Sequence, residues 1–122
     1  MYIVFIDDEK PILECMELLG PTVGWTVRCF DDPDRALFAL QKDGQNPDFI
    51  FLDNHFPKTQ HGAEFYAREL RQLFPQTAIG LLTGDPEPFA DASNAPWQFV
   101  VGKPFTVQDL KTIIETYAEC NT

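Results

Sequence analysis

The sequence predicts a doubly wound α/β fold, in which a five-stranded parallel sheet carries helices on both faces. Short runs of strand length recur along the chain, and segments with helical spacing lie between them. The clearest runs are nearly all apolar and are followed by polar or turn residues, which is typical of parallel strands covered on both faces. Strands that alternate with helices in this order favour a parallel sheet. The four clearest runs are Tyr2–Ile6, Phe49–Leu52, Ile79–Leu82 and Phe99–Val101.

The first half of the chain supplies one further strand and two helices. The run Trp25–Phe30 is more mixed and suits a less buried strand. Asp32 and Pro33 have the pattern of an N-cap followed by proline at the first helical position, which opens a helix over Asp34–Lys42. The first helix is predicted from an apolar stripe spaced i, i+3, i+4 and i+7, namely Ile12, Cys15, Met16 and Leu19.

The second half supplies two more helices. One spans Ala63–Leu73 and is followed by Pro75; its predicted apolar stripe is Phe65, Tyr66, Leu70 and Leu73. The other opens with a capping box formed by Thr106 and Asp109 and runs through Tyr117. Its predicted stripe is Leu110, Ile113, Ile114 and Tyr117.

The stretch Gly84–Gln98 resists this pattern. It contains three prolines and little periodicity, so at most two turns of helix fit there, around Glu87–Ser93. A short or irregular fourth helix is therefore expected.

The length and the net charge of the chain limit the number of domains and the kinds of binding partner. A chain of 122 residues, 44% of them apolar, suits one domain over residues 1–122 with a real core. The net charge of −10 and the scattered nine Lys and Arg residues disfavour direct nucleic-acid binding, which needs clustered cations. An acidic surface suits a cation or a protein partner with a basic face, although a merely soluble acidic protein has the same composition. We expect a monomer or weak dimer.

Cysteine usage and the N-terminus indicate the compartment. Cys15, Cys29 and Cys120 are odd in number and far apart, which favours a reduced, cytoplasmic setting; Cys15 and Cys29 are expected to be small core side chains. The apolar stretch after Met1 is too short for a signal peptide, and no run approaches the ~20 apolar residues of a membrane helix. Membrane insertion is not expected.

Polar residues follow the predicted strands at the edge where an open parallel sheet binds ligands. Taken singly, each of these residues can have a role that involves no ligand: Asp8 can cap the next helix, and Asp7 can be solvated. Their joint occurrence is what points to a site. The residues at the strand ends are Asp7, Asp8 and Glu9, then Asp53, then Thr83 and Gly84, and finally Gly102, Lys103 and Pro104.

Clustered carboxylates of this kind repel one another unless a cation joins them. Mg2+ prefers oxygen ligands and needs only one or two carboxylates plus a phosphate oxygen. With the ammonium of Lys103 on the same edge, the pattern predicts a Mg2+-dependent site for a transferring phosphoryl group.

Four motifs carry a family resemblance: the acidic pair in IVFIDDEKPI, FIFLDNHFP around Asp53, LLTG at Thr83 and GKPF at Lys103. From Tyr2 to about Tyr117 the chain resembles a response-regulator receiver domain of the CheY-like type, which has a flavodoxin-like fold. The resemblance implies a stand-alone receiver of two-component signalling with no output domain. It also implies that the protein is a phosphorylated switch rather than an enzyme.

The resemblance implies a role for each matching residue. Asp53 is the phosphoacceptor, which attacks phosphorus as a carboxylate. Asp8 and Asp53 are direct Mg2+ ligands, Asp7 acts through water, and the backbone carbonyl of His55 is the third protein ligand.

The remaining matches imply a switch. Thr83 binds a phosphoryl oxygen, Lys103 pairs with the acceptor and then its phosphate, and Pro104 follows a cis peptide bond. The phosphoryl donor is a histidine kinase or a His-containing phosphotransfer protein. The readout is an altered protein-binding surface around the fourth helix and fifth strand, recognised by a downstream protein.

The sequence departs from the family pattern in three places. The switch aromatic is usually three residues before the lysine, where Val100 lies; Phe99 fills the role if Gly102 is a one-residue insertion, and is otherwise core. The stretch Gly84–Gln98 is about one helical turn short. One residue is inserted in PKTQHG, in the loop beside the acceptor, and His55 and His61 lie in this region. As a hypothesis, His55, His61 and Asp85 tune the lifetime of the phosphoryl group.

Three alternatives compete with the phosphoryl switch. The first is a scaffold that keeps the fold but is not phosphorylated. The intact site residues argue against it, and the irregular stretch Gly84–Gln98 weakly favours it. A haloacid-dehalogenase-like phosphohydrolase would have an Asp-x-Asp pair, whereas Asn54 and His55 follow Asp53. Flavin binding lacks a Ser/Thr-rich phosphate loop after the first strand.

Overall fold

The computed structural model contains a five-stranded, all-parallel sheet with the strand order β2-β1-β3-β4-β5. The structure describes residues 1–86, 88 and 94–120. In chain order the elements are β1 (Tyr2–Ile6), α1 (Lys10–Leu19), the single-turn helix η1 (Gly20–Val23), β2 (Thr26–Phe30), α2 (Pro33–Asp43), β3 (Phe49–Asp53), α3 (Ala63–Leu73), β4 (Ala78–Thr83), β5 (Phe99–Gly102) and α4 (Val107–Cys120).

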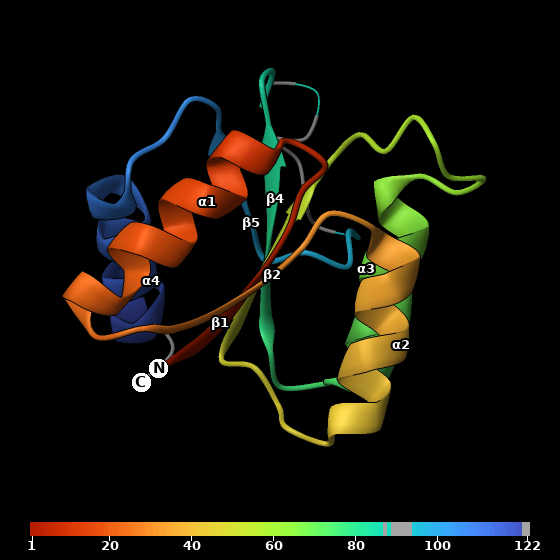
Figure 1. Cartoon of the computed structure of the whole chain (residues 1–122), viewed down its shortest axis with the longest axis horizontal. Coiled ribbons are helices and arrows are strands. Elements are labelled where there is room, and N and C mark those ends of the chain that lie inside the picture. The colour runs from red at the N-terminus through yellow and green to blue at the C-terminus, as the bar shows by residue number, and fades with distance from the viewer. Residues whose placement is uncertain (87, 89–93, 121–122) are drawn as a thin grey trace.

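The predicted doubly wound architecture is confirmed. In Figure 1, α1 and α4 lie on one side of the sheet and α2 and α3 on the other. Each predicted strand differs from the observed one by no more than one residue at either end. The short helix expected around Glu87–Ser93 falls, except for Pro88, outside the described residues.

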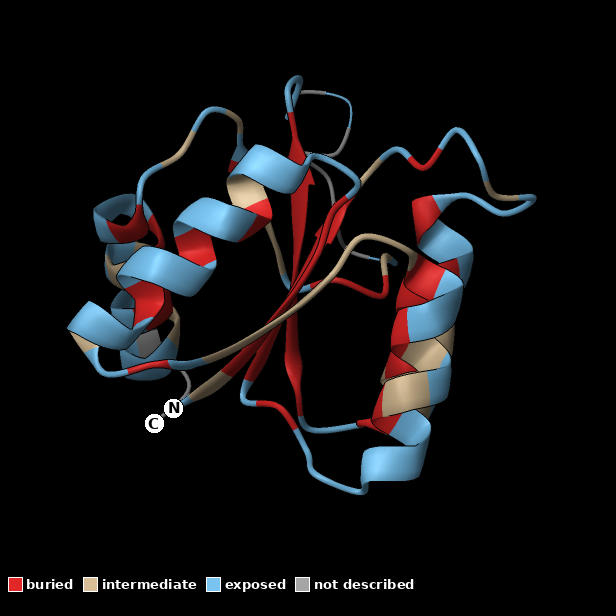
Figure 2. Ribbon diagram, in the orientation of Figure 1, coloured by how far each residue is buried: buried red, intermediate tan, exposed pale blue. Residues whose placement is uncertain are grey.

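Two apolar cores flank the sheet, because side chains of a strand alternate between its faces. The α2 and α3 side holds Val4, Ile50, Leu81 and their neighbours, whereas the α1 and α4 side holds Phe5, Phe51, Leu82 and theirs. Figure 2 shows the central strands almost wholly buried and the helices buried along their inward surfaces. The inner strands β1 and β3 are thus fixed by packing on both faces.

The predicted helix caps are confirmed. The side chain of Asp32 accepts hydrogen bonds from the backbone N–H groups of Asp34 and Arg35, at 2.8 and 3.4 Å, and opens α2. Thr106 and Asp109 exchange reciprocal bonds of 2.9 and 3.0 Å at the start of α4. These bonds satisfy backbone donors that the first helical turn leaves free.

The predicted apolar stripes of α1 and α3 were wrong in part. In α1 the buried side chains are Leu13 and Met16, whereas Cys15 and Leu19 are exposed. In α3 the buried face is Ala63, Tyr66, Ala67 and Leu70, and Phe65 is exposed. The prediction for α3 followed the large apolar residues and passed over Ala63 and Ala67, which are buried together with Tyr66 and Leu70.

Cys29 is half-buried, in keeping with its expected core position. Burial raises the pKa of its thiol to about 12, and the negative charge of Glu17 adds to the effect. Within the described ranges, no helix has both the length and the apolar content to cross a bilayer.

Candidate functional site

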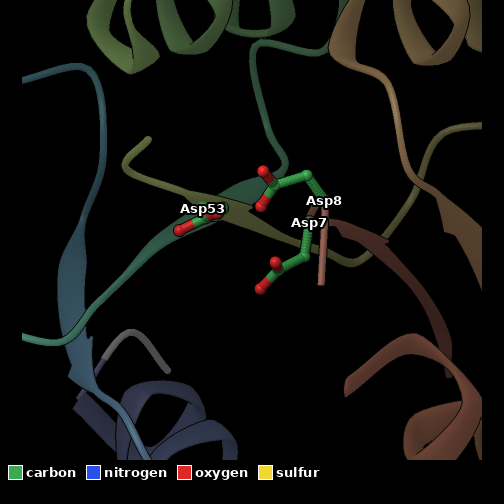
Figure 3. A group of neighbouring side chains, drawn as sticks. All are labelled: Asp7, Asp8 and Asp53. Carbon is green, nitrogen blue, oxygen red and sulfur yellow. The ribbon is translucent and has the colours of Figure 1, made fainter. Parts of the chain in front are cut away.

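Three aspartates meet at the carboxyl edge of the sheet, beyond β1 and β3. One carboxylate oxygen from each of Asp7, Asp8 and Asp53 lies within 4.8 Å of the other two. Figure 3 shows the two side chains that follow β1 and the one that ends β3 gathered in the same space. The convergence follows from the topology, because β1 and β3 are adjacent parallel strands and end at the same edge.

The three aspartates differ in burial. Asp7 is fully buried and Asp53 is 4% exposed, whereas Asp8 is exposed. The alternative that Asp7 is merely solvated is therefore wrong. Asp8 does not cap α1 either: the N-cap residue is Glu9, which makes no side-chain cap bond, and it is Asp7 Oδ1 that accepts the Glu9 N–H at 2.9 Å.

Lys103 joins the cluster from the end of β5. Its ammonium lies 2.9 Å from Asp7 Oδ2 and 3.1 Å from Asp53 Oδ1. A third carboxylate, Glu9 Oε2, lies 3.7 Å away; the sequence placed this residue at the strand end but assigned it no role. The peptide bond from Lys103 to Pro104 is cis, as predicted.

The pKa values reflect this crowding. Burial, followed by the negative charge of Asp7, raises the pKa of Asp53 to about 7, although Lys103 acts in the opposite direction. Burial by itself lowers the pKa of Lys103, but the neighbouring carboxylates of Asp7 and Asp53 outweigh it and the net direction is upward. The site in this form therefore carries more negative charge than Lys103 balances.

Thr83 ends β4 next to the acidic cluster and is 1% exposed. Its hydroxyl oxygen accepts a hydrogen bond from the Asp85 N–H at 3.1 Å, so the side chain is engaged with its own loop. Its backbone carbonyl accepts the N–H of Lys103 at 2.7 Å. The two strands thus present Thr83 and Lys103 as a linked pair.

Phe99 lies on the opposite face of the sheet from Thr83. Its ring packs against Phe51 and Tyr117 on the α4 side, where a Cβ on Gly80 would come within 2.4 Å of it. Val100 packs instead into the α2 and α3 side. The assignment of Phe99 as the switch aromatic stays a prediction, and this packing does not favour it.

An open pocket of about 640 Å³ adjoins the cluster. Its polar wall includes Asp8, Asp53, His55 and Lys103. Its apolar wall comes from α1 and the turn before α4, and includes Pro11, Ile12, Met16 and Phe105. The exposed His55 therefore faces this pocket, whereas His61 does not line it and stacks on Phe65 at 3.8 Å between ring centroids.

The donor set fits Mg2+, since three carboxylates within mutual reach offer hard oxygen ligands with excess negative charge. The roles of Asp7, Asp8, Asp53 and the His55 carbonyl as ligands stay predictions. Sequence reasoning missed the contact of Glu9 with Lys103. The adjacency of Glu9 to the acidic pair was the available signal.

Comparison with solved structures supports the fold. A response-regulator receiver domain from Clostridium thermocellum is 25% identical with a TM-score of 0.80, covering 94% of this chain and 91% of its own. The chemotaxis protein CheY4 of Vibrio cholerae is 21% identical with a TM-score of 0.80, covering 94% and 96%. TrrA of Thermotoga maritima, solved in complex with Mg2+ and BeF, is 24% identical with a TM-score of 0.77, covering 94% and 96%.

The family model described as "Response regulator receiver domain" matches residues 3–115. That range begins in β1 and ends within α4, so it includes β1 apart from Tyr2, the other four strands, and every residue of the acidic cluster. Receiver domains are signalling modules of two-component systems, and Mg2+ binding is typical of them. This chain belongs to the response regulator receiver domain family.

Proposed function

We propose that the chain is a phosphoacceptor switch in which Asp53 receives a phosphoryl group. A carboxylate oxygen of Asp53 attacks phosphorus, a new O–P bond forms, and the bond from phosphorus to the donor breaks with its electron pair leaving on the donor. The observation that carries the proposal is the position of Asp53, which lines a pocket, lies within reach of two further carboxylates and is 3.1 Å from the Lys103 ammonium.

Asp7, Asp8, Asp53 and the His55 carbonyl are the groups that would hold Mg2+. When bound, the ion neutralises carboxylate charge and that of the incoming phosphoryl group. The chain's own contribution is positional. Asp7 Oδ1 is held by the Glu9 N–H, and Lys103 lies between Asp7 and Asp53, where its ammonium is ready to contact a phosphoryl oxygen.

The phosphoryl donor is a histidine kinase or a His-containing phosphotransfer protein, a class with which receiver domains interact. The pocket supports this assignment, because its apolar wall, including Ile12, Met16 and Phe105, offers a docking surface beside the acceptor. Such a donor places the protein in the cytoplasm. Direct nucleic-acid binding is not proposed, given the net charge of −10.

The switch resides in Thr83 and Lys103. Phosphorylation adds charge and acceptor oxygens at Asp53. To bind them, the Thr83 hydroxyl gives up the hydrogen bond that it donates to the Asp85 carbonyl at 3.3 Å and donates to the phosphoryl group instead. That exchange displaces the loop after β4 and alters a surface that a downstream protein recognises.

His55 faces the pocket, whereas His61 stacks on Phe65, so we assign to His55 the tuning of phosphoryl lifetime that the sequence suggested. The dephosphorylation rate of His55→Ala, compared with that of His61→Ala, measures this effect. Equal rates for His55→Ala and wild type would dispose of the assignment.

Acetyl phosphate with Mg2+, followed by intact mass, separates this function from a phosphorylation-independent scaffold. Wild type is expected to gain one phosphoryl group, and Asp53→Asn and an EDTA-treated sample to gain none. No added mass in wild type, under conditions that label a control receiver, would favour the scaffold.

A further inference from the structure

Arg71, in the last turn of α3, is held by an unusual set of partners. Its guanidinium donates to the backbone carbonyls of Phe74, Pro75 and Thr77 at 3.4, 3.1 and 2.6 Å. It also donates to the carbonyl of Pro96 at 3.2 Å and to Gln98 Oε1 at 2.5 Å. These five acceptors are all uncharged, so the contacts serve to position the chain rather than to pair charges.

Gln98 connects this arrangement to the sheet. The side-chain oxygen Oε1 of Gln98 accepts the backbone N–H of Ile79 in β4 at 2.6 Å. The backbone N–H of Gln98 donates to the Ile79 carbonyl at 2.8 Å. The Gln98 side chain therefore adds one hydrogen bond between β4 and the chain just before β5, at the amino end of the β4–β5 ladder. We call this set of residues, Arg71, Gln98 and Ile79, the α3 junction.

The α3 junction lies at the amino ends of β4 and β5, and the functional residues Thr83 and Lys103 lie at their carboxyl ends. The pairs Gly80↔Phe99 and Thr83↔Gly102 bound the ladder that connects the two ends. Because β5 has four residues and is an edge strand, it has one neighbouring strand to hold its register. The junction supplies a second point of attachment.

The acidic cluster is carried by other strands of the sheet. Asp7, Asp8 and Asp53 follow or end β1 and β3, which are inner strands buried on both faces. Within the α3 junction, Ile79 is paired with Ile50 of β3, whereas the printed hydrogen bonds of the Arg71 guanidinium and of the Gln98 side chain go to the α3–β4 turn, Pro96 and Ile79. Because the pairing of Ile79 with β3 does not require those side-chain bonds, their removal is expected to affect phosphoryl binding at the end of β5 more than metal binding at the ends of β1 and β3.

We propose that Arg71 is a positioning residue for phosphoryl binding, which acts through Gln98 and Ile79 on the placement of Thr83 and Lys103. This inference rests on the proposed function of Asp53. It adds that the affinity for a phosphoryl group depends on a side chain at the far end of β4 and β5, whereas Mg2+ affinity does not.

The test compares Arg71→Met with Arg68→Met, a control on the same helix whose Nη2 pairs with Glu64 at 3.0 Å on the surface. Mg2+ affinity is measured alone by calorimetry, and beryllofluoride affinity is measured at saturating Mg2+ by fluorine NMR. Arg71→Met is expected to bind beryllofluoride about fivefold more weakly, the lower end of typical coupling between sites, with Mg2+ affinity unchanged. Arg68→Met is expected to match wild type in both.

A second pair of variants covers the case in which Arg71→Met fails to fold. Gln98→Leu removes the acceptor shared by Arg71 and Ile79, and is expected to weaken beryllofluoride binding in the same way. Gln98→Glu keeps the acceptor and is expected to retain wild-type affinity. Equal or tighter beryllofluoride binding by Arg71→Met or Gln98→Leu, or a matching loss of Mg2+ affinity, would overturn the inference. Failure of wild type itself to bind beryllofluoride would instead count against the proposed function.

Discussion

The two halves of the site differ in how the sheet supports them. The acidic half is carried by β1 and β3, inner strands buried from both faces. The half proposed to bind the phosphoryl group is carried by β4, also an inner strand, and by β5, an edge strand of four residues that Gln98, a partner of the α3 side chain Arg71, directly precedes. The comparison indicates that the proposed metal ligands follow strands paired on both sides, whereas Lys103, proposed to bind the phosphoryl group, follows a strand paired on one side.

Removal of the Lys103 ammonium has the largest expected effect on stability. Lys103→Met leaves the fully buried Asp7 without its cation, and breaking a buried pair costs about 3 kcal/mol. Urea unfolding in EDTA measures the loss, and saturating Mg2+ is expected to reduce it. Lys58→Met, at an exposed position, serves as the control. A cost below about 1 kcal/mol, the range of surface pairs, would show that Lys103 does not stabilise the acidic half.

Asp8→Ala sharpens the comparison from the metal side. If Asp8 is a direct ligand, as proposed, its loss is expected to weaken Mg2+ binding by roughly 100-fold. That is the upper end of the loss in metal affinity seen when residues that only support the ligands are changed. Because Asp8 is exposed, the stability of the metal-free protein is expected to change little. Calorimetric Mg2+ titration checks the first point and urea unfolding the second. Unchanged Mg2+ affinity would remove Asp8 from the ligand set.

The raised pKa of Asp53 predicts a pH dependence in the metal-free protein. Burial and Asp7 raise this pKa from 3.8 to about 7, so folding disfavours the charged carboxylate. The stability associated with the neutral form is complete below the unfolded pKa and is lost as the pH rises through the folded pKa. With both proteins in EDTA, the free energy of unfolding of Asp53→Asn relative to that of wild type is thus expected to rise by about 2 kcal/mol from pH 5 to pH 8. A difference that stays constant across that range would contradict the raised pKa.

Phe99→Leu tests the face of the sheet on which the switch operates, and has the smallest expected effect. Loss of aromatic packing against Phe51 and Tyr117 is expected to cost about 1 kcal/mol in urea unfolding. Beryllofluoride affinity is expected to stay at the wild-type value, because the ring lies on the opposite face from Thr83. A selective loss of that affinity would restore Phe99 as the switch aromatic.

Much of the fold was predictable because its signal is local. The buried strands β1, β3 and β4 have apolar runs with polar ends, and the more mixed run of β2 and the short run of β5 were also recognisable, so all five strands were placed to within one residue. Helix faces were less predictable. Cys15 and Phe65 have the right spacing for a buried stripe, but the surface a helix presents to the sheet depends on its neighbours, and small residues such as Ala67 were passed over.

The site was predictable in so far as it depends on strand ends. Adjacent parallel strands bring Asp7, Asp8 and Asp53 together whatever the details of packing. The face on which Phe99 lies depends on the register of β5, which the sequence leaves open. The contact between Arg71 and Gln98 spans 27 residues and has no sequence period, so no local pattern indicates it.

The central claim is that Asp53 accepts the phosphoryl group. Borohydride reduction of protein treated with acetyl phosphate and Mg2+ converts an aspartyl phosphate into homoserine, which peptide mass spectrometry assigns to one position. The account predicts homoserine at position 53 in wild type, and no homoserine at all in Asp53→Asn. Homoserine at position 7 or 8 in wild type, or no homoserine at any position, would contradict it.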